Sequence, residues 1–464
     1  MAQMRAWEQA SWAVGRSEEA VMRAAGHAVA EAARRFAGPD ASILVLAGKG
    51  HNGDDVRFAA AELSPDKVRI VNVTEPVAAA AEVRELLVTT RPSLIIDGLF
   101  GIGLNRPLDE TWRVLVELVN ASNVPVLAVD VPSGLDADTG EPMGAAIRAT
   151  VTVTFGAPKM GLVRLSSPGF VGRLEVATKI GLIECPHRAE LNWTLPEDFI
   201  GFPPPRPLAS HKGTYGHLGI IAGSLGYHGA ALLAMRGALR AHPGLVTLHV
   251  AENVYGPVAA QTQAAMVRPW LPGEWELDDY SAVLAGPGLA SRDLPPSLGE
   301  AVLRAWRHST KLVVVDASAL DWLPAGATHE GAARVITPHP GEAARLLGTT
   351  IASVQADRAS ALRELSRKFG GCWVVLKGHQ TLVGRSKGDL FINPSGNPRL
   401  AQGGSGDVLA GYVAGLLAQP RLQSDPLAAL RFAVWQHGAA ADYLERGRRA
   451  WGVEDLAVEL GAAR

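Results

Sequence analysis

The second half of the chain contains the stretch Gly396-Asn397-Pro398-Arg399-Leu400-Ala401-Gln402-Gly403-Gly404-Ser405-Gly406-Asp407, in which a glycine-rich loop and one carboxylate lead into an apolar helical pattern. Three glycines among four residues allow successive backbone N–H groups to turn toward one point. The helix that follows adds its unpaired N-terminal donors and the positive end of its dipole. The stretch therefore predicts a phosphate-binding loop with Asp407 beside it. Local physics alone also fits a capped helix after a glycine-rich turn, so other segments must decide between the two.

The residues around this stretch follow the rhythm of an α/β protein. Short apolar runs alternate with helical stretches in both halves of the chain, which is typical of parallel sheets covered by helices. The segment Gly201-Phe202-Pro203-Pro204-Pro205-Arg206-Pro207 interrupts this rhythm, because proline lacks a backbone donor and restricts the residue before it. We therefore expect two distinct domains, 1–202 and 203–464. The expected strands are Ile43-Leu46, Val68-Val73, Leu94-Ile96 and Val126-Val129, then Leu218-Ala222, Leu245-Val250, Ala282-Ala285, Leu312-Val315, Arg334-Ile336 and Trp373-Leu376.

Composition and charge exclude several classes of function. The chain has 464 residues, 47% of them hydrophobic and 19% charged, as expected for globular domains of about 100–200 residues each. A net charge of −2 provides no field that would attract nucleic acid or an anionic membrane. Cys185 and Cys372 lie in no disulfide or metal spacing, which favours a reducing compartment. Neither a signal peptide nor a membrane span is indicated, so we expect a cytoplasmic protein.

Three strand ends in the first half carry polar residues. The first strand leads into Gly48-Lys49-Gly50-His51-Asn52-Gly53-Asp54-Asp55, the third into the run from Asp97 to Pro107, and the fourth into Asp130-Val131-Pro132-Ser133. Ligands of open parallel sheets bind beyond the carboxyl ends of strands. Asn52, Asp97, Asp130 and Ser133 are therefore candidates to converge on an ion or a polar ligand, although each strand-terminal aspartate also fits a turn cap.

These three motifs resemble the signatures of NAD(P)H-hydrate epimerases, which have a Rossmann-like three-layer αβα fold. The resemblance implies that Asn52, Asp97 and Ser133 hold a potassium ion, and that Asp130 contacts the damaged nicotinamide ring. Asp130 would be the group that transfers the proton during interconversion of the R and S hydrates. The residues that would bind the hydrate in this domain are His51, Asn52, Gly53, Asp54, Asp55, Gly101, Ile102, Gly103, Leu104, Asn105, Arg106, Pro107 and Asp130.

The first domain departs from the family pattern at three positions. Asp54 and Val56 stand where the family has glycines, and Arg23 stands where it usually has glutamate. A glycine permits close backbone approach to a ligand, and a side chain in its place can block it. These departures support an alternative in which the first domain is a non-catalytic nucleotide-binding module.

The second domain resembles the ribokinase-like dehydratase of the same cofactor-repair system. The resemblance rests on the opening stretch together with Gly223-Ser224-Leu225-Gly226, Gly286-Pro287-Gly288, Thr337-Pro338-His339-Pro340-Gly341-Glu342 and Lys377-Gly378-His379-Gln380-Thr381. It implies repair of hydrated NADH and NADPH, with ADP as phosphate donor, Mg²⁺ on the reacting phosphates and Asp407 as general base. The residues that would bind the hydrate are Ala231, Gly288, His339 and Asp407, and those that would bind the nucleotide are Lys377, Gly378, His379, Gln380, Thr381, Gly404, Ser405 and Gly406.

The two resemblances together indicate a fused bifunctional enzyme, which we expect to form a homo-oligomer. A vitamin or sugar kinase is an alternative for the second domain, because the ribokinase-like fold uses the same glycine loop and aspartate base. The motif around His339 and the attached first domain disfavour that alternative.

Overall fold

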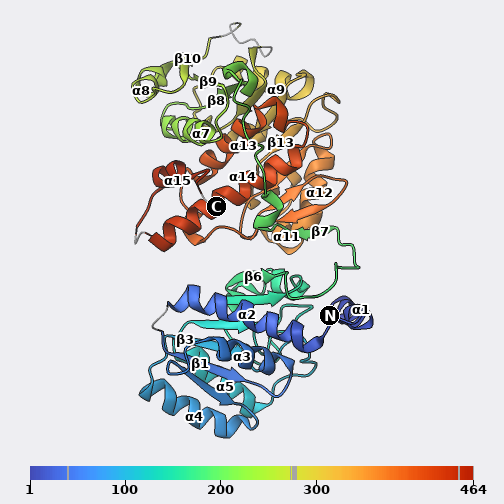
Figure 1. Cartoon of the computed structure of the whole chain (residues 1–464). Helices are drawn as coiled ribbons and strands as arrows, with labels where there is room; N and C mark the ends of the chain where they lie inside the picture. The colour runs from blue at the N-terminus through green and yellow to red at the C-terminus, as the bar shows by residue number, and fades with distance from the viewer. Residues whose placement is uncertain (39–40, 272, 274–278, 448–449, 463–464) are drawn as a thin grey trace. The chain divides into compact units, whose positions relative to one another are not determined.

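The structure is a computed structural model of the whole chain and describes all residues except 39–40, 272, 274–278, 448–449 and 463–464. The chain divides into two compact units, residues 1–188 (the first unit) and 189–464 (the second unit). Figure 1 colours the first unit from blue to blue-green and the second from green to red. Each unit has its own sheet and its own hydrophobic core.

The first unit is built on a parallel sheet, six-stranded within the described residues, with the strand order β2-β1-β3-β4-β5-β6. Its central strands are buried along their whole length, as expected for strands covered on both faces. Because the order reverses at β1, the ends of β1 and β3 flank the position where such sheets bind ligands. The strands are β1 Ile43–Ala47, β2 Val68–Asn72, β3 Leu94–Gly98, β4 Val126–Val129, β5 Val151–Phe155 and β6 Arg173–Ala177.

Helices cover both faces of this sheet. One apolar cluster joins α2 and α3 to Ile43, Val45 and Ile96, and a second joins α4 and α5 to Leu44 and Leu46. Alternate residues of β1 thus face opposite layers, which gives the expected three-layer αβα arrangement. The helices are α1 Ala2–Ala13, α2 Glu18–Ala37, α3 His51–Glu62, α4 Pro76–Thr89, α5 Glu110–Ala121 and α6 Pro168–Val171.

The second unit contains a mixed sheet, ten-stranded within the described part, with the order β10-β9-β8-β11-β12-β13-β14-β15-β16-β7. The strands from β10 to β14 are parallel, whereas β15 runs antiparallel to both of its neighbours. This is the α/β class expected for the second domain. The strands are β7 Leu191–Trp193, β8 His217–Ile221, β9 Leu245–Val250, β10 Met266–Pro269, β11 Ala282–Ala285, β12 Leu312–Val315, β13 Arg334–Ile336, β14 Trp373–Leu376, β15 Leu382–Gly384 and β16 Leu390–Ile392.

The division between the units falls before the proline-rich segment, at 188/189 and not at the expected 202/203. The intervening residues belong to the second unit because β7 pairs with β16. Phe199 also packs against Phe432 and Trp435, with ring centroids 5.4 and 5.3 Å apart. Prolines thus interrupt regular structure without marking the edge of the core.

Helix α13, which begins within the glycine-rich stretch, is buried at the centre of the second unit. Every residue from Val408 to Leu417 is buried, and the helix packs along α7. A Cβ on Gly411 would overlap the Ala234 carbonyl oxygen, so the two helices touch backbone to backbone. The remaining helices are α7 His228–Arg240, α8 Tyr255–Ala259, α9 Pro296–His308, α10 Pro340–Leu347, α11 Ile351–Ala356, α12 Arg358–Lys368, α13 Ser405–Leu417, α14 Pro426–Gly447 and α15 Val453–Glu459.

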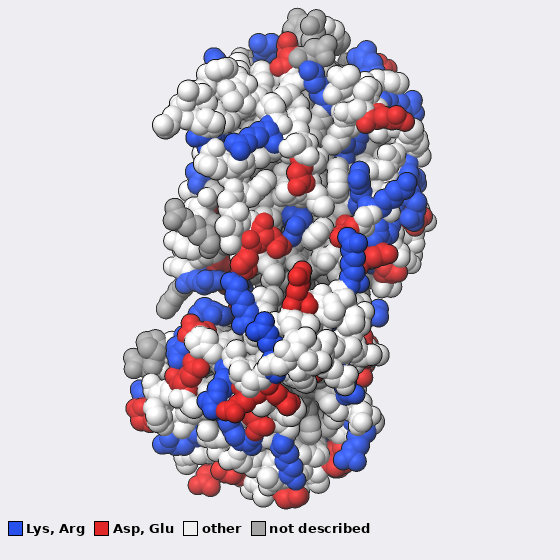
Figure 2. All heavy atoms as spheres, turned by 45° about the vertical axis from the view of Figure 1, so that its right-hand side comes forward, with Lys and Arg blue, Asp and Glu red and all other residues white. Residues whose placement is uncertain are grey.

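The surface agrees with the small net charge. On the face shown in Figure 2, basic and acidic side chains are interspersed, so an anionic ligand on this face would be held by local groups. Among the described helices, none combines the length and the apolar character that crossing a membrane requires.

A pair of glycine-to-alanine variants tests the contact between α7 and α13. Gly411→Ala is expected to destabilise the second unit by about 1–3 kcal/mol, because the new methyl group overlaps the Ala234 carbonyl. Gly299→Ala in α9 meets open space and is expected to stabilise by about 0.5–1 kcal/mol, because alanine is the better helix former. Urea unfolding of both variants measures the difference. Equal effects would contradict the backbone contact.

Candidate active sites

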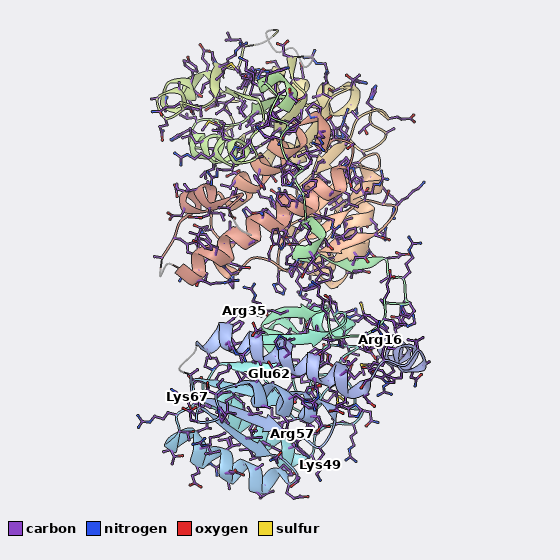
Figure 3. The ribbon with its side chains drawn as sticks, in the orientation of Figure 1. Arg16, Arg35, Lys49, Arg57, Glu62 and Lys67 are labelled. Carbon is purple, nitrogen blue, oxygen red and sulfur yellow. The ribbon has the colours of Figure 1, made fainter. Side chains whose placement is uncertain are left out.

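The turn after β1 brings the first motif against the β3 loop. A Cβ on Gly48 would overlap the Leu99 carbonyl oxygen, and a Cβ on Gly53 would overlap the Gly48 carbonyl oxygen. Arg57 of α3, labelled in Figure 3, braces the turn by donating from Nη2 to Gly48 O at 2.9 Å. Lys49 lies in the turn that precedes α3, and Glu62 is the last residue of that helix. The glycines therefore allow two strand-end loops to touch at backbone distance.

The structure brings together the three residues predicted to hold potassium. Asp97 accepts from Ser133 Oγ at 2.6 Å and from the Ser133 N–H at 2.8 Å. Phe100 N–H donates to Ser133 Oγ at 2.8 Å, and Asn52 Nδ2 donates to Phe100 O at 3.0 Å. One amide, one carboxylate and one hydroxyl thus form a connected oxygen-rich cluster at the ends of β1, β3 and β4.

Asp97 is fully buried in this cluster, and its burial raises its pKa to about 6 although the Ser133 and Leu99 hydrogen bonds act in the opposite direction. A cation beside a buried carboxylate favours its ionised form. Hard oxygen donors suit alkali and alkaline-earth cations better than softer metals. Within the described residues, no group of three or more His, Cys, Asp or Glu side chains is arranged to hold a metal ion. The cluster therefore offers oxygen atoms of the kind that bind hard cations.

Asp130 forms a buried ion pair that the sequence did not predict. Its Oδ1 atom accepts from Lys159 Nζ, from Thr154 Oγ1 at 3.1 Å and from Phe155 N–H at 3.3 Å. Lys159 Nζ also donates to Thr154 Oγ1 at 2.9 Å and to Phe155 O at 3.0 Å. Asp130 has a φ of +63°, a conformation that non-glycine residues rarely adopt and that often accompanies function.

Two further carboxyl groups lie in the electrostatic neighbourhood of Asp130. Burial raises the pKa of Asp55 to about 8, with Asp130, Asp54 and Glu8 adding to the effect. Asp55 Oδ1 is buried without a hydrogen-bond partner in the structure. Burial and then Asp130 also raise the pKa of Glu8, which comes from α1. The first unit thus places two carboxyl groups with raised pKa values, Asp55 and Glu8, in the electrostatic neighbourhood of Asp130 and Lys159.

The two substituted glycine positions have different surroundings. Asp54 forms an ion pair with Arg57 at 2.8 Å and is 44% exposed. Val56 is fully buried in the apolar cluster under α3, and a Cβ on Gly98 would press against its side chain. Arg23 is exposed, pairs with Glu19 and stacks over Phe58 at 4.7 Å.

The other predicted hydrate-binding residues of the first unit lie near the surface. His51 is exposed at the start of α3, with Nε2 3.6 Å from Glu18 Oε1. The run from Gly101 to Pro107 forms a partly exposed loop after β3. Gly101 approaches Asn52, because a Cβ on it would lie 3.2 Å from Asn52 Cγ.

In the second unit, Asp407 stands in the first turn of α13. Gly404 is the N-cap residue with a left-handed φ of +94°, which glycine adopts without strain. Ser405 Oγ donates to Leu400 O at 2.7 Å, and the buried His437 lies with Nε2 3.0 Å from Ser405 O. Burial lowers the pKa of His437 to about 4, so its ring is neutral behind the loop. Gly404 thus turns the chain into the N-terminus of α13, where the N–H groups of a helix favour an anion.

A lysine and three carboxylates gather beside this loop. Lys377 Nζ lies 2.7 Å from Asp316 Oδ1 and 3.9 Å from Glu342 Oε2, and a Cβ on Gly406 would lie 3.3 Å from the same nitrogen. Burial opposes the lysine charge, but Asp316 and Glu342 outweigh it and raise the pKa of Lys377. Burial first, then Asp316 and Glu342, raise the pKa of Asp407 to about 7. Asp407 is thus a carboxylate poised to exchange a proton near neutral pH.

His339 is the N-cap of α10. Its Nδ1 atom accepts from the backbone N–H groups of Gly341 at 3.0 Å and Glu342 at 3.3 Å. The backbone N–H group of His339 donates to Glu342 Oε2 at 2.7 Å. Because Nδ1 accepts, the ring carries its proton on Nε2 in this arrangement. The side chain is 52% exposed, so the ring remains accessible to a ligand.

Ala231 and Gly288, both predicted to bind the hydrate, are in close contact with other residues of the second unit. Ala231 is fully buried under Gly223, because a Cβ on Gly223 would lie 2.8 Å from Ala231 Cβ. A Cβ on Gly288 would overlap the Tyr227 carbonyl oxygen. Both positions thus set how closely α7 approaches the loops around it.

The predicted nucleotide loop from Lys377 to Thr381 follows β14. Gly378 and His379 are exposed, and Gly378 and Gln380 have positive φ values of +134° and +54°. The carbonyl groups of this loop bond to the side chain of Arg358 at the start of α12.

Several residues of the two sites carry no glycine-rich signal in the sequence. Lys159 follows an apolar run and Pro158, and this position is only a weak sign that it lies after the end of a strand. Glu8, Arg358 and His437 lie in ordinary helical segments. Glu342 lies in one of the motifs that carry the resemblance, and Asp316 directly follows the strand Leu312–Val315.

The folds and sites define a two-domain α/β protein with a glycine-rich loop at a helix N-terminus in its second unit. Residues 218–459 match the family described as NAD(P)H-hydrate dehydratase, and residues 18–161 match the YjeF-related protein N-terminus. The bifunctional NAD(P)H-hydrate repair enzyme Nnr of Gloeobacter violaceus is 37% identical over 99% of this chain and 96% of its own length. The enzyme of the same name from Coxiella burnetii is 35% identical over 99% and 97%. The chain belongs to the family of bifunctional NAD(P)H-hydrate repair enzymes.

Solved structures agree for the second unit. The ADP/ATP-dependent NAD(P)H-hydrate dehydratase of Bacillus subtilis, co-crystallised with ATP and Mg²⁺, is 32% identical with a TM-score of 0.50, covering 56% of this chain and 92% of that one. A ribokinase-like superfamily protein of Enterococcus faecalis is 25% identical with a TM-score of 0.50, covering 60% and 97%. The predicted fold class and the predicted repair function are confirmed, and the match of the second unit favours a dehydratase over a vitamin or sugar kinase.

A double-mutant cycle tests the packing of Val56 against Gly98. Gly98→Ala is expected to destabilise the first unit by about 1–3 kcal/mol, because the added methyl group meets the Val56 side chain. Val56→Ala removes that contact, so the same Gly98 change is expected to be milder in its background, with a coupling of at least about 0.5 kcal/mol. Denaturant unfolding of the four proteins measures it. Additive effects would show that the two residues do not share this space.

Proposed function

We propose that the second unit transfers a phosphoryl group from a nucleotide to the hydroxyl group of hydrated NADH or NADPH and then releases phosphate. The observation that carries this proposal is the position of Asp407, in the first turn of α13 beside a glycine loop, with its pKa raised to about 7. Membership of the repair family supports the identity of the hydrated substrate.

Each group of the loop has a task in this reaction. The ionised Asp407 accepts the proton of the substrate hydroxyl group. The oxygen of that hydroxyl group bonds to the terminal phosphorus of ADP, and AMP leaves. Backbone N–H groups of Gly404, Ser405 and Gly406 stabilise the charge on the moving phosphoryl group. The carbon–oxygen bond then breaks with loss of phosphate, and the neighbouring ring carbon loses a proton, which restores the dihydronicotinamide. His339 contacts the hydrate in this proposal, and the loop from Lys377 to Thr381 contacts the nucleotide.

Mg²⁺ fits this site as a companion of the nucleotide. The Bacillus subtilis relative was co-crystallised with ATP and Mg²⁺, which supports a metal-bound donor. Asp316 and Glu342 are the buried carboxylates nearest to the Lys377 ammonium group and would face such an ion. When bound, Mg²⁺ neutralises phosphate charge. ADP as the preferred donor is part of the proposal.

For the first unit, we propose epimerisation of the R and S hydrates with Asp130 as the proton-transfer group. The support is its left-handed backbone, its bond to Lys159 and the protonated carboxyl group of Asp55 nearby. Asn52, Asp97 and Ser133 would hold K⁺, whose charge stabilises the substrate-facing cluster. The ion pair of Asp54 with Arg57 and the burial of Val56 in the core favour a catalytic domain over a non-catalytic binding module.

A cytoplasmic location and assembly into a homo-oligomer are also part of the proposal. The unpaired Cys185 and Cys372 support a reducing compartment.

Dehydration is expected to depend on pH through Asp407. Because the base must be ionised, kcat/KM for the hydrate should rise about tenfold per pH unit below pH 7 and level off above about pH 7. Asp407→Asn should lower kcat by at least about 100-fold at pH 8. The recovery of dihydronicotinamide absorbance from hydrated NADH with ADP or ATP measures both effects.

Unfolding measurements separate this loss from misfolding. The folded pKa of Asp407 is raised, so its contribution to stability falls as the pH rises from about 4 to about 7. Asp407→Asn should therefore be at least as stable as the natural protein at pH 8. Full activity of this variant would refute Asp407 as the base.

Epimerisation is expected to require Asp130 and to tolerate a change at Asp54. With mixed R and S hydrates and excess nucleotide, Asp130→Asn should recover only the S fraction quickly, and the rest at the spontaneous rate. Asp54→Gly should match the natural protein within about twofold, because Asp54 contacts Arg57 and not Asp130. A natural protein that recovers only the S fraction would favour the non-catalytic module.

A further inference from the structure

Arg358, the first residue of α12, holds the loop after β14 through its backbone oxygens. Its Nη2 atom donates to Leu376 O at 2.9 Å and to Lys377 O at 3.2 Å. Its Nη1 atom donates to Gln380 O at 3.3 Å and also to His379 O. A single guanidinium group therefore collects four carbonyl groups from five consecutive residues.

This arrangement fixes the direction of the loop N–H groups. In a planar trans peptide, the C=O and N–H bonds point to opposite sides. The peptide between Leu376 and Lys377 shows the effect, because its C=O bonds Arg358 and its N–H donates to Pro338 O at 2.9 Å. By the same geometry, the N–H groups of Gly378 and Gln380 point away from Arg358. The loop thus presents donors on the side opposite the guanidinium group.

The loop needs such support because its backbone is unusual. Gln380 has a left-handed φ of +54°, which a residue with a Cβ adopts only where its surroundings hold it. Gly378 has a φ of +134°, and a Cβ there would lie 3.3 Å from Arg358 Nη2. Burial lowers the pKa of Arg358 only to about 10, so the guanidinium stays charged at neutral pH and polarises the four carbonyls.

We propose that Arg358 is a positioning residue for the nucleotide: it holds residues 377–381 in the conformation whose amide groups bind the phosphates of a nucleoside diphosphate or triphosphate. This inference rests on the proposed function of the loop. Arginine suits the task because its planar fork can donate to several acceptors at once, whereas lysine offers a single ammonium group.

Arg334 provides a matched control within the same unit. It is buried, and burial lowers its pKa to about 10 as well. Its guanidinium group also bonds backbone oxygens, with Trp306 O and Ser309 O at 2.6 Å and Lys311 O at 3.0 Å. None of these oxygens belongs to the loop after β14. Its loss therefore reports the effect of removing a buried arginine that does not hold this loop.

The test compares Arg358→Met, Arg358→Lys and Arg334→Met in the full chain. Both Arg358 variants are expected to raise the KM for ADP and ATP by about tenfold or more, with the KM for the hydrate changed by less than about twofold. Arg334→Met is expected to lower the Tm and leave both KM values unchanged. An unchanged nucleotide KM in the Arg358 variants, or an equal rise in Arg334→Met, would overturn the inference.

Calorimetric titration with ADP and ATP separates this inference from the function it rests on. If the natural protein binds neither nucleotide, the proposed function fails. If the natural protein binds them and the Arg358 variants bind equally well, only the role of Arg358 fails. Should Arg358→Met not fold, Arg358→Lys decides alone, because it keeps the charge and loses the four-carbonyl geometry.

Discussion

Backbone-to-backbone contact at the ends of parallel strands is the constraint on which both units depend. A parallel sheet brings the carboxyl ends of its strands to one edge, and the loops that leave them must pack in little space. Gly48 meets Leu99 in the first unit, and Gly286 meets Asp316 in the second, each at a distance that a Cβ would not allow. Through these contacts, side chains that lie far apart in the sequence reach one another. The carboxylates of each site therefore lie close together because the loops that carry them pack against one another.

Each unit places one lysine among the carboxylates of its site. Carboxylates at strand ends lose water when loops close over them, which raises their pKa and destabilises their charge. In the first unit, Lys159 bonds directly to Asp130, the residue predicted to exchange the proton. In the second unit, Lys377 bonds Asp316 and approaches Glu342, and the pKa of Asp407 stays raised to about 7. Lys159 thus offsets the charge of the predicted base itself, whereas Lys377 offsets the charge of two neighbours of Asp407.

The sequence predicted the elements that carry a strong local signal. Strands such as Val126–Val129, Ala282–Ala285 and Leu312–Val315 appear with the expected bounds, because four consecutive apolar residues mark a buried parallel strand. The three-residue strands β7, β15 and β16 are too short for any periodicity, and β5 alternates valine with threonine. We expected the domain junction at the proline-rich segment. In the structure, the pairing of β7 with β16 places the residues before that segment in the second unit. Glycine motifs located the loops of both sites, but Lys159 and Arg358 act through long-range contacts that no local pattern contains.

The departures at Asp54 and Val56 show why a family pattern needs the structure for its interpretation. From the sequence, two glycines replaced by larger residues suggested a blocked ligand site in the first unit. The structure places the Val56 side chain in the core beneath α3, where Gly98 leaves room for it, and turns Asp54 toward Arg57. Arg57 in turn donates to the Gly48 carbonyl group, so Asp54 supports the turn after β1 through its ion pair with Arg57. The backbone contact that the turn does require, at Gly53 against Gly48, is retained. Of the two larger residues, Val56 thus fills space in the protein core, and Asp54 pairs with a neighbouring side chain on the surface of α3.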